Sequence, residues 1–197
     1  MANLLFDLYG VLIKHRTDGV RRDVEKRLGV DENHRDALWD AYHRLREPLD
    51  LGAISDQEWW ATVARTAGLE DFPIEEAIQA EKDTLLIPHE DAVSLVRELI
   101  AQGHTVGVLS NIPHVLAEGL VDKHAWFKEF HSVTFSCDIH AVKPDHAAYA
   151  RAVADLGTKP SETIFFDDTL GNVEAARAFG LRAVHYTGVQ SITDTLA

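Results

Sequence analysis

The sequence has few basic residues, one cysteine and no long apolar run, and each shortage excludes a class of protein. Its 197 residues include 19 Lys and Arg against 32 Asp and Glu, a formal net charge of −13. A general nucleic-acid-binding protein needs clustered cations to meet phosphates, so we expect no nucleic-acid partner. No stretch approaches the ~20 apolar residues of a membrane span, and we expect neither a membrane partner nor a signal peptide.

The single cysteine, Cys137, excludes an internal disulfide and is typical of a reducing compartment, so we expect a cytoplasmic protein. Asp138 follows it and no Lys or Arg is close in sequence, which favours a buried thiol over an activated nucleophile. Several histidines are scattered without the spacing of zinc ligands, so we expect no zinc site among them. They are His124, His131, His140 and His146.

The hydrophobic pattern divides the chain into two kinds of structure. After a predicted buried strand at Asn3–Leu8, the segment from about residue 17 to residue 86 has only helical periodicity. In that segment Ser55 and Glu58 form a capping box, and Pro48 predicts the end of a helix. In the remainder of the chain, predicted helices and strands alternate, which is typical of a parallel sheet with helices on both faces.

The first strand cannot be stable alone and must join the later sheet, so the helical segment is an insertion. The predicted fold is α/β: a Rossmann-like three-layer core with a parallel sheet, plus an inserted helical-bundle cap. We expect a discontinuous core of residues 1–14 and 86–197 and a cap of residues 15–85. Trp59 and Trp60 are interpreted as cap core. Arg44 and Arg46 are interpreted as a solvated helix end, with substrate contact as the alternative.

Polar side chains follow the predicted strands at the points where parallel sheets bind ligands, their carboxyl ends. Each has an ordinary explanation: a turn residue, a helix cap, or a surface lysine. Those explanations do not account for their coincidence at one edge, which predicts a functional site. The residues are Asp7, Ser110, Asn111, Lys143, Asp167 and Asp168.

These positions resemble the ordered motifs of the haloacid dehalogenase-like hydrolase superfamily. Phe-Asp-Leu-Tyr-Gly-Val-Leu at 6–12 is similar to its nucleophile loop, and Val-Leu-Ser-Asn at 108–111 to its second motif. Val-Lys-Pro-Asp at 142–145 is similar to the third, and Phe-Phe-Asp-Asp-Thr-Leu-Gly-Asn-Val-Glu-Ala-Ala at 165–176 to the fourth. The resemblance spans the whole chain, and the helical insertion stands where the C1 caps of the family lie.

The resemblance implies a role for each residue at the sheet edge. Asp7 is the expected covalent nucleophile, which attacks phosphorus to give an aspartyl-phosphate. Lys143 is expected to neutralise the charge shared by nucleophile and phosphate, and Ser110 and Asn111 to bind the substrate. Mg²⁺ is the implied cofactor, because carboxylates and carbonyls are its usual ligands. Its expected ligands are Asp7, the backbone carbonyl of Tyr9, Asp167 and Asp168.

Tyr9 departs from the pattern of the family's phosphatases, which have a general acid and base aspartate there. Losing such a group typically costs about 10²–10⁴-fold in rate. A tyrosine at this place resembles the family's haloacid dehalogenases, whose halide leaving group needs no proton. Val11 and the acidic pair Asp167-Asp168 depart from those dehalogenases, because the two carboxylates would repel an anionic haloacid unless a cation intervened.

We therefore expect a Mg²⁺-dependent hydrolase of a small phosphorylated metabolite, acting as a monomer or homodimer. Three alternatives stay open at this point: a metal-free haloacid dehalogenase-like enzyme, a phosphonatase-like enzyme, or a weakly active binding protein. A phosphonatase would use a cap lysine, for which Lys26 and Lys82 are the candidates.

Overall fold

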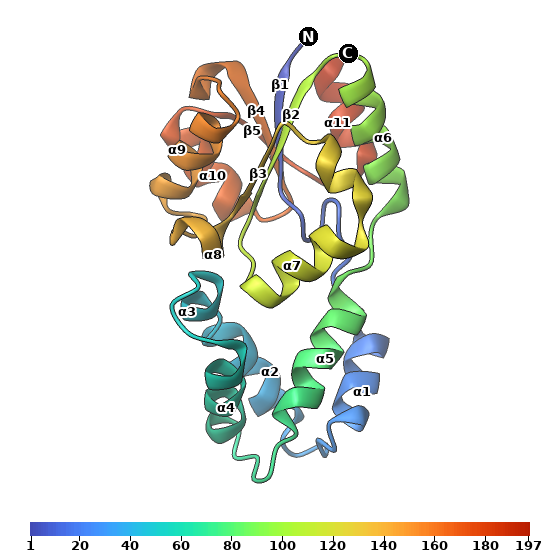
Figure 1. Ribbon diagram of the computed structural model, residues 1–197, viewed down its shortest axis with the longest axis vertical. Helices are drawn as coiled ribbons and strands as arrows, with labels where there is room; N and C mark the ends of the chain where they lie inside the picture. The colour runs from blue at the N-terminus through green and yellow to red at the C-terminus, as the bar shows by residue number, and fades with distance from the viewer.

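The computed structural model describes residues 1–197 and shows an open, fully parallel five-stranded sheet (Figure 1). Its spatial order is β3-β2-β1-β4-β5, so the first strand lies at the centre, as its apolar sequence requires. The predicted α/β class is confirmed. The strands are β1 (Asn3–Phe6), β2 (Thr105–Ser110), β3 (Ser132–Phe135), β4 (Thr163–Asp167) and β5 (Arg182–His185).

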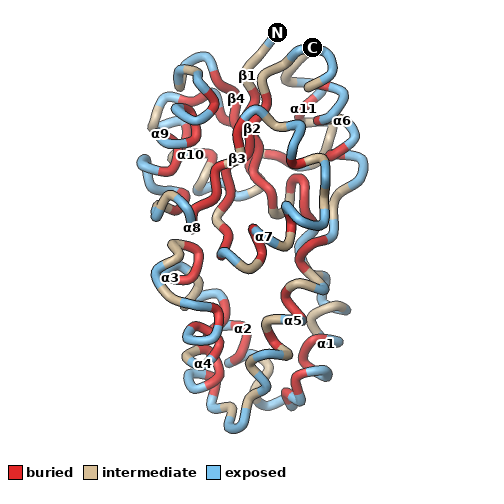
Figure 2. The backbone as a smooth tube through the Cα atoms, in the orientation of Figure 1, coloured by how far each residue is buried: buried red, intermediate tan, exposed pale blue.

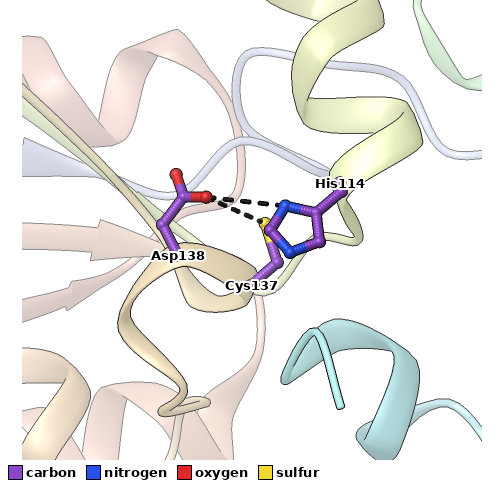
Figure 3. Close-up of side chains that lie close together, drawn as sticks. All are labelled: His114, Cys137 and Asp138. Carbon is purple, nitrogen blue, oxygen red and sulfur yellow. Dashed lines mark hydrogen bonds and ion pairs between the residues drawn. The ribbon is translucent and has the colours of Figure 1, made fainter. Parts of the chain in front are cut away.

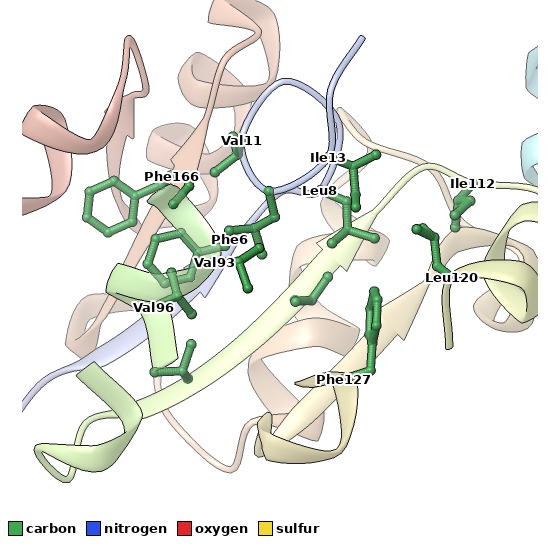
Figure 4. Packing of buried hydrophobic residues seen from close by; sticks show 14 of the residues in the cluster. Phe6, Leu8, Val11, Ile13, Val93, Val96, Ile112, Leu120, Phe127 and Phe166 are labelled. Atoms are coloured by element: carbon green, nitrogen blue, oxygen red, sulfur yellow. The ribbon is translucent and has the colours of Figure 1, made fainter. Parts of the chain in front are cut away.

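Helices cover both faces of the sheet, which gives three layers (Figure 1). Helices α6 (Glu90–Ala101) and α11 (Val189–Leu196) pack on one face. Helices α9 (His146–Asp155) and α10 (Leu170–Phe179) pack on the other. Because β1 and β4 are buried on both sides, their sequences are nearly continuous apolar runs. Figure 4 shows Phe6 and Phe166 among the buried side chains of the first face, with ring centroids 5.0 Å apart.

After the loop of residues 7–17, the segment between β1 and α6 contains helices and no strand, and these helices form a separate group beyond the carboxyl edge of the sheet (Figure 1). It has its own buried cluster, which includes Trp59 and Trp60 as expected. Figure 2 shows buried stretches of the backbone within this unit as well as in the sheet domain. The capping box of Ser55 and Glu58 is present at the start of its fourth helix. This helical unit consists of α1 (Asp18–Arg27), α2 (Arg35–Arg44), α3 (Glu47–Asp50), α4 (Asp56–Thr66) and α5 (Ile74–Leu85).

The helical unit is docked on the sheet domain by the loop that follows α3. The buried Ser136 hydroxyl donates to the Asp50 carbonyl at 2.6 Å and accepts from the Ile112 amide at 2.9 Å. Next to it, His140 Nδ1 lies 2.9 Å from the Leu51 carbonyl oxygen. Ser136 begins the short helix α8 (Ser136–Ile139), and Ile112 precedes α7 (His114–Lys123).

Three local expectations differ from the structure. Pro48 does not end a helix: α2 ends at Arg44, and Pro48 lies in the first turn of the short helix α3, where its missing amide hydrogen costs nothing. Helices α8 and α11 were not predicted.

The longest helices have 12 residues, and none has the length and apolar character needed to cross a bilayer.

Candidate active site

Asp7 and Asp167 lie side by side because their strands are hydrogen-bonded neighbours. In the register of β1 and β4, Phe6 is opposite Phe166, and the Asp7 amide donates to the Phe166 carbonyl at 2.9 Å. Both carboxylates therefore leave the sheet at its carboxyl edge, as predicted.

A buried lysine joins these two carboxylates. Lys143 Nζ lies 2.7 Å from Asp7 Oδ1 and 2.7 Å from Asp167 Oδ2. Burial alone would lower the pKa of Lys143, but the two carboxylates together raise it, so the ammonium form persists. The lysine backbone is held by Asn111, whose side chain donates to the Lys143 carbonyl and accepts from its amide, both at 2.8 Å. The structure brings together these four residues, which the sequence analysis placed at one edge of the sheet.

The charge balance around Asp7 is unfavourable for an ionised carboxylate. Burial, opposed by Lys143 and reinforced by the charge of Asp167, raises the pKa of Asp7 to about 7. Asp7 thus holds a proton over part of the neutral range unless a further cation approaches.

Asp168 approaches the chain at Gly10. A Cβ at Gly10 would lie 2.0 Å from Asp168 Oδ2, and the backbone there has φ of +80°, so only glycine fits. The same carboxylate oxygen lies 3.1 Å from His15 Nε2. Although burial acts in the opposite direction, His15 lowers the pKa of Asp168, and the hydrogen bond with Asp168 raises the pKa of His15.

Sequence reasoning missed His15 and Asn172 as site residues. Asn172 Nδ2 lies 3.2 and 3.1 Å from the two Asp167 carboxylate oxygens. The sequence could have identified Asn172 as a site residue, because it follows Asp167 by five residues within the fourth motif. His15 carried no such signal: it lies outside the quoted motifs, and only the fold brings it to Asp168.

The site residues surround a cavity of about 180 Å³. Ser110 is fully buried and does not line this cavity, and its hydroxyl has only a 3.5 Å contact with the Asn111 carbonyl. The lining residues are Asp7, Tyr9, His15, Asn111, Lys143, Asp168, Thr169 and Asn172.

The Tyr9 side chain is turned toward the helical unit. Its hydroxyl donates to the carbonyl of Leu85, the last residue of α5, at 3.3 Å, and burial raises its pKa. The ring stacks on His15 with centroids 6.4 Å apart. The Tyr9 carbonyl oxygen accepts no hydrogen bond from the chain.

The donor set at this edge fits a hard divalent cation. Asp7, Asp167 and Asp168 each offer a carboxylate oxygen, and these atoms lie within 4.8 Å of one another. Three carboxylates face one buried lysine, and oxygen-only sites favour Mg²⁺ over softer metals.

A second cluster lies at the junction with the helical unit, around the single cysteine (Figure 3). Asp138 Oδ1 lies 3.5 Å from His114 Nδ1 and 3.8 Å from Cys137 Sγ. Burial and the neighbouring Asp138 raise the pKa of the Cys137 thiol to about 12, so the thiol is a poor nucleophile at neutral pH. The expectation that Cys137 is buried is confirmed.

Comparison with known proteins agrees with this fold. The family model of the haloacid dehalogenase-like hydrolases matches residues 1–180, and the chain belongs to that family. A sesquiterpene phosphatase of Aspergillus oryzae is 32% identical over 158 residues, which cover 80% of this chain and 68% of that protein.

Solved structures share the fold at lower identity. A haloacid dehalogenase family enzyme of Bacteroides thetaiotaomicron superposes with a TM-score of 0.79 at 19% identity, covering 100% of this chain and 98% of that one. The same enzyme has been solved with magnesium and inorganic phosphate, with a TM-score of 0.72, 19% identity and 93% coverage of both chains. An L-2-haloacid dehalogenase of Xanthobacter autotrophicus, solved with chloropropionic acid covalently bound, has a TM-score of 0.68 at 21% identity, covering 100% of this chain and 82% of that one.

Proposed function

We propose that this protein is a Mg²⁺-dependent phosphatase of a small phosphorylated metabolite, with Asp7 as the nucleophile. The observation that carries the proposal is the cluster of three carboxylates, of which Asp7 and Asp167 contact buried Lys143. One lysine does not balance three carboxylates, and a divalent cation would supply the missing charge. The ligands would be Asp7, the free carbonyl of Tyr9, Asp168 and Asp167. The family's phosphatase relative and the neighbour solved with magnesium and phosphate support this assignment.

In this reaction an Asp7 oxygen attacks phosphorus, and the bond between phosphorus and the leaving alcohol oxygen breaks. Water then hydrolyses the aspartyl-phosphate and releases inorganic phosphate. Lys143 keeps its proton, orients the Asp7 carboxylate and stabilises charge on the phosphoryl group. Asn111 lines the cavity and fixes the lysine, so it is the proposed substrate-binding residue of this pair. Ser110 is buried behind it and would act only through the backbone that positions Asn111. Bound Mg²⁺ would reduce the repulsion between the Asp7 carboxylate and the phosphate oxygens.

Tyr9 determines which leaving groups are favoured. Its hydroxyl is engaged by Leu85 and its raised pKa keeps it protonated, so it cannot act as a base. Without a carboxylic acid at this position, the enzyme should be fastest with phosphate esters whose alcohol leaves without being protonated. We therefore expect an aryl phosphate to outpace an alkyl phosphate.

The helical unit is proposed to be a cap of residues 15–85 over a core of residues 1–14 and 86–197. Its docking through Asp50 and Ser136 would hold it over the side of the Asp7 cavity where the leaving group departs. Such a cover excludes water from the reacting groups and selects the leaving group.

The test is hydrolysis of p-nitrophenyl phosphate, measured with Mg²⁺ and with a chelator. Asp7→Asn should abolish release of p-nitrophenol, whereas Asp194→Asn, an exposed change on α11, should leave it intact. Tyr9→Asp should raise the rate by restoring a general base for the attack of water on the aspartyl-phosphate, a step that does not depend on the leaving group. If neither the natural protein nor Tyr9→Asp shows metal-dependent release, the proposal is wrong.

Tyr9 also favours one second candidate, a metal-free dehalogenase in which Asp7 attacks carbon and expels halide. Halide release from 2-chloropropionate in the presence of a chelator measures this activity. Release that Asp7→Asn abolishes would establish it, and no release would exclude it.

A further inference from the structure

A second cavity adjoins the Asp7 cavity on the side of the helical unit. It has a volume of about 250 Å³ and lies between α1, α2 and the carboxyl edge of the sheet. Tyr9, His15 and Asn111 line both cavities, so a molecule that reaches Asp7 can extend into the second one. Its size is below the roughly 300–1,000 Å³ of pockets for drug-sized ligands, which limits the occupant to a small group.

Three arginines line this second cavity and no carboxylate does. Arg46 forms ion pairs with Asp50 at 2.9 Å and Glu81 at 3.2 Å, and neither of these carboxylates lines the cavity. Arg16 Nη2 lies 3.6 Å from Glu81, too far for a hydrogen bond. Arg21 has no ion-pair partner. Within ion-pair distance the three guanidinium groups thus have only these two carboxylate partners, and the cavity lining itself is cationic. Asp18, Glu25 and Asp36 lie with Arg21 around a separate cavity.

The arginines are held in place by aromatic rings. The guanidinium carbons of Arg16 and Arg46 lie 5.6 and 5.3 Å from the centroid of the Tyr42 ring. Arg21 lies 5.3 Å from the centroid of the Trp39 ring. Because cations already occupy these aromatic faces, the rings are engaged rather than free to stack on a base or another aromatic ligand.

Two further observations indicate that the cavity suits an anion. Arg16 Nη2 is buried and has no hydrogen-bond partner, an uncommon and costly state for a guanidinium nitrogen. At the cavity wall, burial and then the charges of Arg21, Arg46 and Arg16 lower the pKa of His43, which is consistent with positive potential at that point.

We propose that this cavity binds a second anionic group on the leaving half of the substrate. The preferred substrate class is then a small phosphate monoester whose alcohol part carries a carboxylate or another phosphate. This inference rests on the proposed phosphatase activity at Asp7. Arg21 lines the cavity without an ion-pair partner and is the principal contact, with Arg16 and Arg46 completing the anion site.

The test compares three esters that differ in the group away from the scissile phosphate. Glycerol 3-phosphate is neutral there, 3-phosphoglycerate carries a carboxylate, and propane-1,3-diol bisphosphate carries a phosphate. A hydrogen bond to a charged group contributes about 1.5–3 kcal/mol, so kcat/KM for one or both anionic esters should exceed that of glycerol 3-phosphate at least about tenfold. Which of the two is faster identifies the anion.

Arg21→Gln should reduce this preference by about tenfold, mainly through a higher KM for the anionic ester. Arg22→Gln is the matched control, because Arg22 follows on the same helix, is exposed and does not line the cavity. Circular dichroism establishes that both variants are folded. Equal kcat/KM for the three esters, or a preference unchanged in Arg21→Gln, would overturn the inference.

Failure of the underlying phosphatase activity gives a different result. In that case no ester, including p-nitrophenyl phosphate, is hydrolysed with Mg²⁺. The affinity of the protein for 3-phosphoglycerate and for glycerol 3-phosphate is then measured by calorimetric titration. Tighter binding of 3-phosphoglycerate that weakens in Arg21→Gln supports the anion site, and equal binding of the two compounds contradicts it.

Discussion

Replacing Lys143 with methionine removes the cation between Asp7 and Asp167 while keeping most of the side-chain volume. Lys143 Nζ is 2.7 Å from an oxygen of each carboxylate, and the ammonium is almost completely buried. Removing one partner of a buried ion pair typically costs about 3–5 kcal/mol, because the remaining charges are left without compensation. We expect a loss of this size in the free energy of unfolding at pH 8 in the presence of a chelator.

The loss should depend on pH through Asp7. The pKa of Asp7 is raised from 3.8 to about 7, so the folded protein retains a proton that the unfolded chain releases. Stability from this group is fully present below pH 3.8 and is lost as the pH rises through about 7, with a limiting slope of about 1.4 kcal/mol per pH unit. Lys143 lowers the pKa of Asp7, so in Lys143→Met that pKa rises further. The cost of the substitution should therefore be smaller at pH 5 than at pH 8.

Urea unfolding followed by tryptophan fluorescence measures both effects. Lys159→Met is the matched control, because Lys159 contacts Glu162 at 3.3 Å on the surface, and its loss should change stability by less than about 0.5 kcal/mol. Saturating Mg²⁺ should restore stability, by about 2.7 kcal/mol at a hundred times its dissociation constant. A cost that is the same at pH 5 and pH 8, or no larger than that of the control, would refute this reasoning.

Three other substitutions test the docking of the helical unit and one helix start. Ser136→Ala leaves the buried Asp50 carbonyl without its donor and should cost about 1–3 kcal/mol in urea unfolding. Gly52→Ala places a Cβ 2.7 Å from the Cys137 carbonyl at a φ of +66°, so it should undock the loop and speed alkylation of the Cys137 thiol; an unchanged alkylation rate would contradict this. Ser55→Ala removes a helix N-cap and should cost about 1 kcal/mol, with thermal unfolding as the measure.

The order of strands and helices was predictable because each strand is a buried apolar run between turn residues. Helix α8 was not, because four residues are too few to show a period. The role of Pro48 was misjudged because a proline after a helical pattern reads the same whether it ends one helix or begins the next. In the structure one helix ends at Arg44 and the next begins at Glu47, so Pro48 belongs to the start of the second helix.

The acidic part of the site was predictable for a topological reason. Residues at the carboxyl ends of neighbouring parallel strands must meet, so Asp7 and Asp167 could be paired from their positions alone. Arg21 and Arg46 could not be paired in this way. They lie on different elements of the helical unit, and their shared cavity depends on how those helices pack, for which the sequence has no equivalent rule.

The net charge of −13 and the proposed anionic substrate are compatible because charge acts locally in this molecule. At physiological ionic strength, exposed charges are screened beyond about 8 Å, whereas buried or half-buried cations act with less screening. Lys143, Arg16 and Arg46 are largely withdrawn from solvent, and they line two cavities that share a wall. A small ester can place its phosphate at Lys143 and a second anion at the arginines without meeting the acidic surface. A long polyanion would have to lie against that surface, so the same charge distribution disfavours large polyanions and is compatible with the proposed substrate.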